Sequence, residues 1–268
     1  MRRSQSGETV SGQDNEFRLP QGFFEQPLTG RELADFADCP HKFLLSHFVD
    51  RQQTRRFLGG PAALHHALRG AIVQFYREGA TADEAQNRLL EAFEQLWEGE
   101  LCADTMEEER LHQQGRRILT DFAASWVADN PAALYADLSL LGEIEGNKFT
   151  AVADLVMPAE AEGGPLRVIR LNSSRRPPTA PELAGDISAG LLLLLAEQHF
   201  SPEPVSVSYY CVRPGSLRRV EIAAEARDYL RRDLSSRVAR MRREKDFAPR
   251  KGKYCRWCRA RSRCAIWN

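Results

Sequence analysis

The sequence predicts an α/β fold in which a central mixed sheet is flanked by helices and preceded by a helical N-terminal lead. Three observations support this. Residues 29–130 place apolar side chains at three- and four-residue intervals, which is typical of amphipathic helices. Residues 131–222 change to short β-like runs separated by turns, with one apolar helix among them. An arginine-rich amphipathic segment follows from residue 223, and this order of elements favours a three-layer domain.

The helical lead begins with a capping box. In LTGRELADF, Thr29 is followed three residues later by Glu32, a spacing at which the two side chains bind each other's free backbone N–H groups. We expect this first helix to run through the step from Cys39 to Pro40, where the proline restricts the residue before it. Further helices are expected at residues 60–79, 81–101 and 107–127.

The middle of the chain contains three short β-like runs, which are broken by a Gly-Asn pair and by the EAEGGP turn. A largely buried helix is expected at 181–200, and a hairpin at 205–222 turns around a Pro-Gly pair. A basic helix should then run from about Ala223 to Lys245. The three runs are 138–146, 148–158 and 166–172, and the apolar stripe of the basic helix is Tyr229, Leu230, Leu234, Val238 and Met241.

Composition argues against a membrane protein. The chain has 268 residues, of which 43% are apolar and 28% charged, and its longest apolar run, 191–196, is too short to cross a bilayer. No apolar stretch follows the two arginines near the start, so no signal peptide is expected. We expect a cytoplasmic protein with a flexible N-terminal segment, residues 1–28, and one domain, residues 29–268. Within it we distinguish a helical lead (29–130), a sheet core (131–222) and a basic helix with a cysteine segment (223–268).

Charge is unevenly distributed along a chain whose formal net charge is zero. From Arg227 to the C-terminus there are 15 Lys and Arg residues against four Asp and Glu residues. The preceding residues carry 22 basic and 33 acidic side chains. A basic end of this kind indicates a polyanionic partner, most commonly nucleic acid. The alternative is that the basic helix docks on the acidic remainder of the same chain.

Four of the six cysteines form a pattern that suggests one metal centre. Cys255, Cys258 and Cys264 have C-x2-C-x5-C spacing, and the remaining ligand would be Cys39, more than two hundred residues upstream. An all-cysteine zinc site usually contains two CxxC pairs, whereas the spacing of iron–sulfur ligands is more varied. The pattern therefore favours a 4Fe–4S cluster, with zinc or ordinary thiols as alternatives. Two more cysteines, Cys102 and Cys211, have no such companions and are expected in the core.

Taken together, these features resemble a known family. The Cys-Pro-x-Lys-Phe step, a histidine in a following helix, three strands, a helix, two strands and a terminal C-x2-C-x5-C are similar to the RecB-like PD-(D/E)XK nucleases. The resemblance is closest to their iron–sulfur branch, found in AddB-type recombination subunits and CRISPR adaptation nucleases. It covers residues 29–268 and implies a cluster, held by Cys39, Cys255, Cys258 and Cys264, that joins the N-terminal helix to the C-terminal segment.

The resemblance also implies a site for Mg²⁺ or Mn²⁺ that this chain keeps only in part. Asp154 stands where the family has its first aspartate, and His65 matches the family histidine better than His66 does. The Asp-x-Lys of the third strand is replaced by Arg170 and Asn172. A cation therefore stands where a metal ligand is needed, and we expect the metal site to be lost. We further expect Arg170 to form an ion pair with Asp154 in place of the metal.

Two more departures bear on activity. The Gln-x-x-x-Tyr motif expected in the next helix is absent, since Ser188 and Leu192 occupy its positions. Glu182 and Asp186, at the start of that helix, are the candidates for a displaced metal-binding carboxylate.

The functional expectation is a catalytically inactive, iron–sulfur nuclease-fold protein that binds DNA or a protein partner in repair, recombination or defence. The alternatives are an active metal-dependent DNA exonuclease that uses displaced carboxylates, and a pure assembly subunit. Cations beside phosphates supply affinity without reading sequence, and Trp257 could stack on a base or pack over the cluster. The candidate phosphate-binding residues are Lys251, Lys253, Arg256, Arg259, Arg261 and Arg263.

Overall fold

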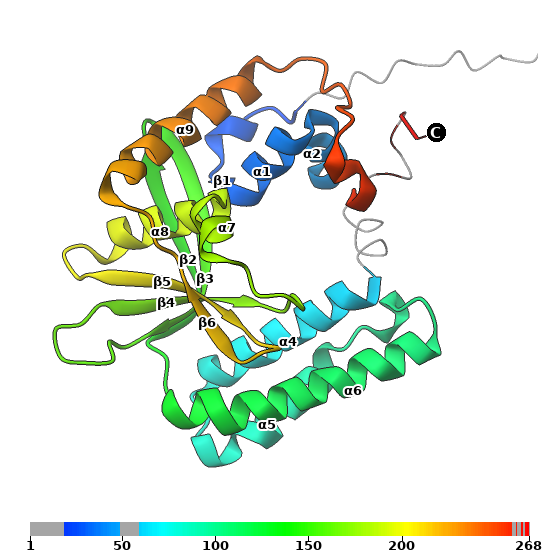
Figure 1. Ribbon diagram of the computed structural model, residues 1–268, viewed down its shortest axis with the longest axis vertical. Coiled ribbons are helices and arrows are strands. Elements are labelled where there is room, and N and C mark those ends of the chain that lie inside the picture. The colour runs from blue at the N-terminus through cyan, green and yellow to red at the C-terminus, as the bar shows by residue number, and fades with distance from the viewer. Residues whose placement is uncertain (1–18, 49–58, 259–260, 262–263, 265, 268) are drawn as a thin grey trace, which may run out of the picture.

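A six-stranded mixed sheet separates two helical layers, as Figure 1 shows. The computed structural model describes residues 19–48, 59–258, 261, 264, 266 and 267. Each face of the sheet is covered by its own hydrophobic core, so the predicted α/β fold of a mixed sheet flanked by helices is confirmed. One face carries α1 (Gly30–Asp38), α2 (Pro40–His47), α8 (Ile187–Phe200) and α9 (Ala224–Arg243), and the other carries α4 (Gly59–Glu78), α5 (Ala85–Leu96) and α6 (Thr105–Phe122).

The sheet combines antiparallel pairs with two parallel ones, β1 with β3 and β4 with β5. β3 pairs with the antiparallel β2 along one edge, while β1 and β4 pair with different stretches of its other edge. The connection from β4 to the parallel β5 contains α8 and a short helix, α7 (Ala180–Ala184). The strands are β1 (Leu28–Thr29), β2 (Tyr135–Ile144), β3 (Asn147–Met157), β4 (Leu166–Asn172), β5 (Val205–Cys211) and β6 (Ser216–Arg219).

The register of β3 and β4 decides which side chains meet. Leu155 pairs with Ile169 in an antiparallel ladder, so the next step along it brings Asp154 beside Arg170. On the other side of β4, Arg170 pairs with Tyr209 of the parallel strand β5. Residues that lie far apart along the chain therefore converge near the middle of the sheet.

The predicted capping box at the start of α1 is present, but the helix does not continue through the Cys-Pro step. The Thr29 hydroxyl accepts a hydrogen bond from the Glu32 backbone N–H at 3.2 Å, and the Glu32 carboxylate accepts one from the Thr29 N–H at 2.7 Å. α1 ends at Asp38, Cys39 is extended (φ −166°, ψ 118°), and α2 begins at Pro40. The prediction of one continuous helix was wrong because proline excludes the helical conformation for the residue before it.

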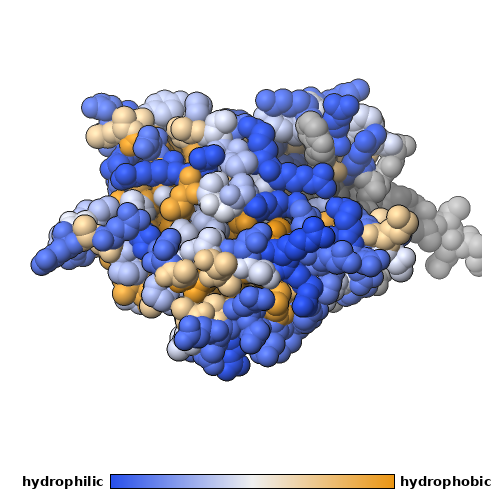
Figure 2. All heavy atoms as spheres, turned by 60° about the horizontal axis from the view of Figure 1, so that its bottom comes forward, coloured by the Kyte–Doolittle hydropathy of each residue, from blue (hydrophilic) through white to orange (hydrophobic). Residues whose placement is uncertain are grey.

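The helical layer of α4, α5 and α6 is packed closely enough to require a glycine. A Cβ atom on Gly115 of α6 would lie 2.3 Å from the Phe93 ring of α5, so only glycine allows this approach. The helix predicted to end near residue 127 extends slightly beyond it, to residue 129, and residues Ala123–Val127 within it form a π-helical turn. In Figure 2, where the side with α5 and α6 comes forward, the surface is mostly hydrophilic with small hydrophobic areas between the polar ones.

Most of the apolar stripe predicted for the basic helix α9 faces the core. Leu234, Val238 and Met241 are fully buried, and Leu230 packs against Gly190 of α8. Tyr229 was assigned to this stripe wrongly, because its side chain is 67% exposed. A helix turns by 100° per residue, which carries Tyr229 off the line of the other four side chains.

The chain before the first strand contributes to the core as well. Residues 1–18 of the predicted flexible segment lie outside the described residues. Within residues 19–28, Phe23 packs edge-on against Phe43 and Phe48 of the α2 region, at ring-centroid distances of 5.9 and 5.3 Å. Of the two cysteines expected in the core, Cys211 is buried and Cys102 half-buried. No helix in the described ranges is long and apolar enough to span a bilayer.

A buried carboxylate holds the angle between α1 and α2. Asp35 is 7% exposed and accepts contacts from Lys42 Nζ at 2.7 Å and His47 Nε2 at 3.1 Å. Burial by itself raises the pKa of Asp35, but the hydrogen bonds from His47 and Lys42 outweigh it and hold the pKa at about 2, below the ordinary value of 3.8. The kink at Cys39 is therefore fixed by an ion-pair network inside the protein.

We predict that this network makes the protein lose stability in acid. The folded-state pKa of Asp35 is depressed, so its contribution is complete above about pH 4 and is lost as the pH falls towards 2. The free energy of unfolding, measured with denaturant, should be about 2 kcal/mol lower for Asp35→Asn than for wild type at pH 6. The two values should become equal by about pH 2. The exposed residue Asp83 supplies the control, since Asp83→Asn should follow the wild type throughout. A gap between wild type and Asp35→Asn that stays constant with pH would contradict the assignment.

Candidate functional site

The centre of the candidate site is a buried aspartate whose two oxygens are fully occupied by protein groups. Asp154, in the middle of β3, is 0% exposed. Its Oδ1 accepts hydrogen bonds from Arg69 Nε at 2.6 Å and from Arg170 Nη1 at 2.9 Å. Its Oδ2 accepts one from the Leu171 backbone N–H at 2.7 Å. The predicted ion pair between Arg170 and Asp154 is therefore present.

A second arginine at this carboxylate was missed by sequence reasoning. Arg69 lies in α4, four residues after His65, and hence on the same helix face. Its Nη2 also binds Asp137 Oδ1 at 2.5 Å, and Asp137 Oδ2 binds Arg77 Nη2 at 3.0 Å. Burial by itself lowers the pKa of Arg69, but the two carboxylates outweigh it and raise the pKa further above neutrality. The spacing of four from His65 to Arg69 is the one signal in the sequence that could have identified this residue.

The histidine expected at the site is present, in surroundings that disfavour its charged form. His65 Nδ1 lies 2.9 Å from Ser173 Oγ, so one of these two atoms donates a hydrogen bond to the other. Burial, together with the positive charges of Arg170 and Arg69, lowers the pKa of His65 against the opposing effect of Asp154. His66 is exposed, as is typical of a solvent-facing helix residue. His65, Asp154 and Arg170 thus converge, while His66 faces away.

The third-strand positions carry no metal-binding carboxylate. Besides its ion pair, Arg170 Nη1 donates to the Val152 carbonyl at 3.1 Å. Asn172 Oδ1 accepts a hydrogen bond from the Ser174 backbone N–H at 2.8 Å and so ends the strand with a turn. These contacts give both side chains a structural role, which leaves the aspartate of β3 without a partner carboxylate on β4.

The two carboxylates proposed as displaced ligands are used as helix caps. Glu182 forms a capping box with Thr179 and an ion pair with Arg176 at 2.5 Å. Asp186 Oδ1 accepts hydrogen bonds from the backbone N–H groups of Ser188 at 2.7 Å and Ala189 at 3.1 Å. These contacts engage both oxygens of Glu182 and Oδ1 of Asp186 at the starts of α7 and α8.

Electrostatics disfavour a divalent cation at Asp154. Two guanidinium groups supply the two positive charges that Mg²⁺ would bring, and they contact the same carboxylate oxygen. At about 5 Å and an intermediate effective dielectric, each would repel Mg²⁺ by roughly 6 kcal/mol. One buried carboxylate with three donors already bound to it does not compensate for that repulsion. Arg69 and Arg170 therefore place two positive charges at this one carboxylate.

The four cysteines of the sequence pattern lie around one pocket. Cys39, Cys255, Cys258 and Cys264 all line a cavity between the junction of α1 and α2 and the C-terminal segment. The Arg250 backbone N–H lies 3.2 Å from Cys39 Sγ. No group of three or more His, Cys, Asp or Glu side chains in the described part of the chain is arranged to hold a single metal ion. The metal centre therefore stays a prediction, whereas the proximity of the α1–α2 junction to the C-terminal segment is a property of the fold.

Contacts that involve no cysteine also join α1 and α2 to the C-terminal segment. His41 Nδ1 lies 3.2 Å from the Phe247 carbonyl oxygen, and Arg250 Nη1 donates to the Ala37 carbonyl at 3.3 Å. The Phe247 ring stacks on Phe43 of α2 at a centroid distance of 6.2 Å. Hydrophobic packing and hydrogen bonds thus position the C-terminal segment beside α1 and α2.

The basic residues of that segment are exposed wherever they are described. Lys251, Lys253 and Arg256 are exposed, and so is Arg261. Lys251 Nζ and Arg261 Cζ lie 5.6 and 4.4 Å from the centre of the Trp267 ring, which is cation–π geometry. The other candidate phosphate-binding residues, Arg259 and Arg263, lie outside the described residues, as does the side chain of Trp257.

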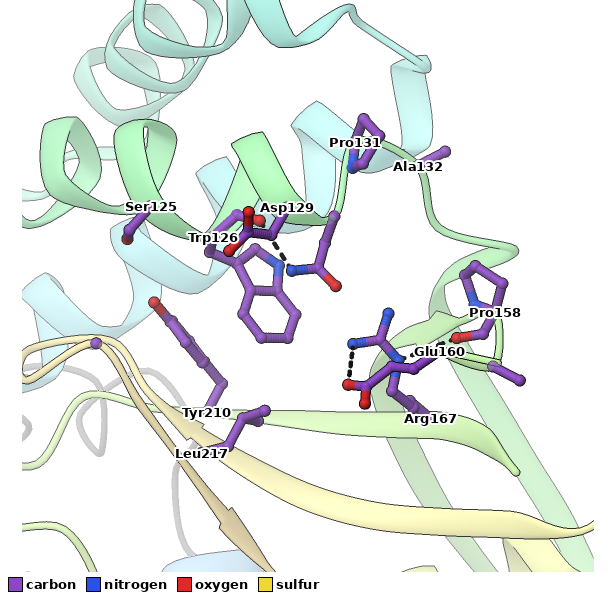
Figure 3. A pocket seen from close by; sticks show the side chains of 13 residues that line it. Ser125, Trp126, Asp129, Pro131, Ala132, Pro158, Glu160, Arg167, Tyr210 and Leu217 are labelled. Carbon is purple, nitrogen blue, oxygen red and sulfur yellow. Dashed lines mark hydrogen bonds and ion pairs between the residues drawn. The ribbon is translucent and has the colours of Figure 1, made fainter. Parts of the chain in front are cut away.

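A separate pocket of about 620 Å³ lies beside the π-helical turn (Figure 3). Trp126 and Tyr210 line it, together with Arg167, whose Nη1 pairs with Glu160 Oε1 at 3.1 Å. None of the residues predicted for catalysis, metal binding or phosphate binding lines this pocket. The sequence contained no motif that pointed to it.

Comparison with known proteins identifies the family. Residues 27–265 match the model of the PD-(D/E)XK nuclease superfamily. No curated protein matches the chain. Two solved structures are similar to it: a "Putative exonuclease" from Eubacterium rectale (12% identity, 94% of this chain and 93% of that chain covered, TM-score 0.48) and SSO0001 (14% identity, 89% and 94% covered, TM-score 0.34). Because both TM-scores are low, the assignment rests on the family model. With a mixed sheet between two helical layers and a buried aspartate on its second long strand, the chain belongs to the PD-(D/E)XK nuclease superfamily.

Proposed function

We propose that this protein is a catalytically inactive member of its superfamily that binds DNA in a DNA-processing complex. The observation that carries the proposal is the pair of arginines, Arg69 and Arg170, on the buried carboxylate of Asp154. Metal-dependent phosphodiester hydrolysis needs a cation that lowers the pKa of the attacking water and stabilises the charge that develops on the phosphate. Guanidinium groups can bind the phosphate, but they cannot activate a water molecule in that way.

The same charges support binding of nucleic acid. Arg170 is 34% and Arg69 26% exposed at the side chain, so both guanidinium groups reach solvent while they bind Asp154. Planar guanidinium groups bind phosphate oxygens in a bidentate manner. In Figure 1 the C-terminal segment with its exposed lysines lies on the same side of the molecule as the start of α4. A nucleic acid bound on this side could contact both regions.

We further propose that the cysteine pocket holds a 4Fe–4S cluster with a structural role. The donor set fits such a cluster, because four thiol groups line one pocket whose other walls include Leu45, Tyr254 and Trp267. Backbone N–H groups lie near two of the sulfurs, from Arg250 to Cys39 at 3.2 Å and from Gly252 to Cys255 at 3.4 Å. Hydrogen bonds of this kind stabilise the thiolate form that binds iron. The bound cluster would cross-link α1 and α2 to the C-terminal segment.

The first prediction from the proposed function concerns cleavage of DNA. Neither the wild type nor Arg170→Asp should cut single-stranded or duplex DNA with Mg²⁺ or Mn²⁺, because Asn172 still occupies the position of the catalytic lysine. The measurement is the release of labelled fragments over time. Asp154→Asn is the matched control, since cleavage that survives this substitution comes from a contaminant. Cleavage by wild type or Arg170→Asp that is lost on adding Asp154→Asn would refute the proposed inactivity.

The second prediction concerns binding. The wild type should bind labelled duplex DNA equally well with Mg²⁺ and with EDTA, because the guanidinium groups replace the metal. Replacing Lys251, Lys253 and Arg261 with Gln should reduce the slope of log affinity against log salt by about 2 to 3. The measurement is a fluorescence anisotropy titration at several salt concentrations. Absence of DNA binding at low salt would contradict the proposal and favour the pure assembly subunit.

The third prediction concerns the cluster. Protein purified without oxygen should contain iron and inorganic sulfide and absorb broadly in the visible range. Cys39→Ser should lose most of the iron and unfold at a lower temperature, because the link between the chain ends is gone. Cys102→Ser, outside the pocket, should retain both properties. Zinc in place of iron, or iron that Cys39→Ser leaves unchanged, would overturn this part of the proposal.

A further inference from the structure

We propose that Arg110, Arg175 and Arg213 form a second phosphate-binding site, which takes the backbone of a nucleic-acid strand that continues past the arginines at Asp154. This inference rests on the proposed function, since it names a further contact for the same ligand. None of the three residues belongs to the cysteine segment or to the predicted catalytic positions. They come from α6, from the loop after β4 and from the turn between β5 and β6.

The fold holds two of these segments together at the end of β4, and Arg110 of α6 lies close enough for its charge to act on Arg213. Arg213 Nε donates a hydrogen bond to the Ser173 carbonyl at 2.6 Å, and the Val212 backbone N–H donates one to the Asn172 carbonyl at 2.9 Å. Arg175 follows Ser173 by two residues and is exposed. The turn that carries Arg213 and the loop that carries Arg175 are thus bonded to each other, which places their guanidinium groups in one region.

Of the three charges in this region, only that of Arg110 is paired with an acid among the described residues. In the described part of the chain, neither Arg175 nor Arg213 forms an ion pair. Arg110 pairs with Glu107 Oε1 at 3.7 Å, and the other oxygen of Glu107 accepts the Ala103 N–H at 2.8 Å. Burial, followed by the charges of Arg175 and Arg110, lowers the pKa of Arg213. The region therefore has excess positive charge, and an anionic ligand would relieve the mutual repulsion.

Ser173 connects this region to the site at Asp154. Its carbonyl oxygen binds Arg213, and its hydroxyl lies 2.9 Å from His65 Nδ1. His65 in turn lies close enough to Arg69 and Arg170 for their charges to lower its pKa. A strand whose phosphate binds at Arg170 could place a neighbouring phosphate at Arg213 and Arg175. In Figure 1 the loop after β4 extends towards α4, the helix that carries His65.

Phosphate is a better match for this region than an acidic protein segment. The three side chains are all arginines, which suit the bidentate geometry of phosphate oxygens. They also lie beside the end of β4, a strand that contributes to the family's phosphodiester site. An acidic peptide could bind a basic surface anywhere on the molecule and gives no reason for this location. An acidic protein partner remains as one outcome of the test below.

The test compares two double variants that remove equal charge. Arg110→Gln/Arg175→Gln removes two exposed members of the proposed site and leaves Arg213 in place to hold the loop. Arg88→Gln/Arg116→Gln removes two exposed arginines of α5 and α6 that pair with glutamates. Both proteins are titrated with labelled single-stranded and duplex DNA across roughly 50 to 200 mM salt. Thermal unfolding checks that both variants are folded.

We expect Arg110→Gln/Arg175→Gln to bind DNA more weakly at low salt, by on the order of tenfold or more. Its slope of log affinity against log salt on duplex DNA should be smaller than that of the wild type by about 2. The control variant Arg88→Gln/Arg116→Gln should match the wild type in both affinity and slope. Wild-type affinity and slope in the first variant would overturn the inference and leave the proposed function intact. An equal loss in both variants would also overturn it, since it would show a response to net charge alone. If the wild type itself binds no DNA, the proposed function fails first, and an acidic protein partner becomes the better candidate for this surface.

Discussion

The structure depends most on the hydrogen-bonded carboxylate of Asp154. A fully buried charge is unfavourable unless opposite charges and hydrogen-bond donors compensate for its lost hydration. Arg69, Arg170 and the Leu171 N–H supply that compensation from α4 and β4. The interaction therefore joins a helix of one layer to two strands of the sheet. It also occupies the oxygens that a metal ion would use.

This arrangement would stabilise a nuclease scaffold without a metal, as the proposed loss of catalysis requires. In the active site that the family pattern requires, carboxylates repel each other until a divalent cation binds between them. Here the second carboxylate is replaced by Arg170, so the site is electrostatically stable by itself. Arg69 continues the network to Asp137 and Arg77, which anchors the long strand β2 as well. The arginines on which the proposed loss of catalysis rests thus also bind the carboxylates that hold these elements together.

A second set of contacts keeps the corner between α1 and α2 beside the C-terminal segment. Pro40 forces a break between α1 and α2, and Asp35 fixes the resulting angle through Lys42 and His47. Phe247 and Arg250 then pack the C-terminal segment against this corner. A cluster held by the four cysteines would reinforce a junction that the protein already forms through its own side chains.

The sequence by itself determined the class of fold, since the change from helical to strand periodicity and the order of elements do not depend on distant contacts. It also determined the candidate residues on β3 and β4, and the ion pair between Asp154 and Arg170 follows from their place on paired strands. Only the tertiary structure decided that Arg69 joins that pair, because its partner is 85 residues away. The same holds for Arg110, Arg175 and Arg213, which share no local motif. Tyr229 is exposed, contrary to expectation, because the exposure of a helical residue depends on packing that local periodicity does not contain. The helix break at Cys39–Pro40 was missed because the exact end of a helix depends on backbone sterics.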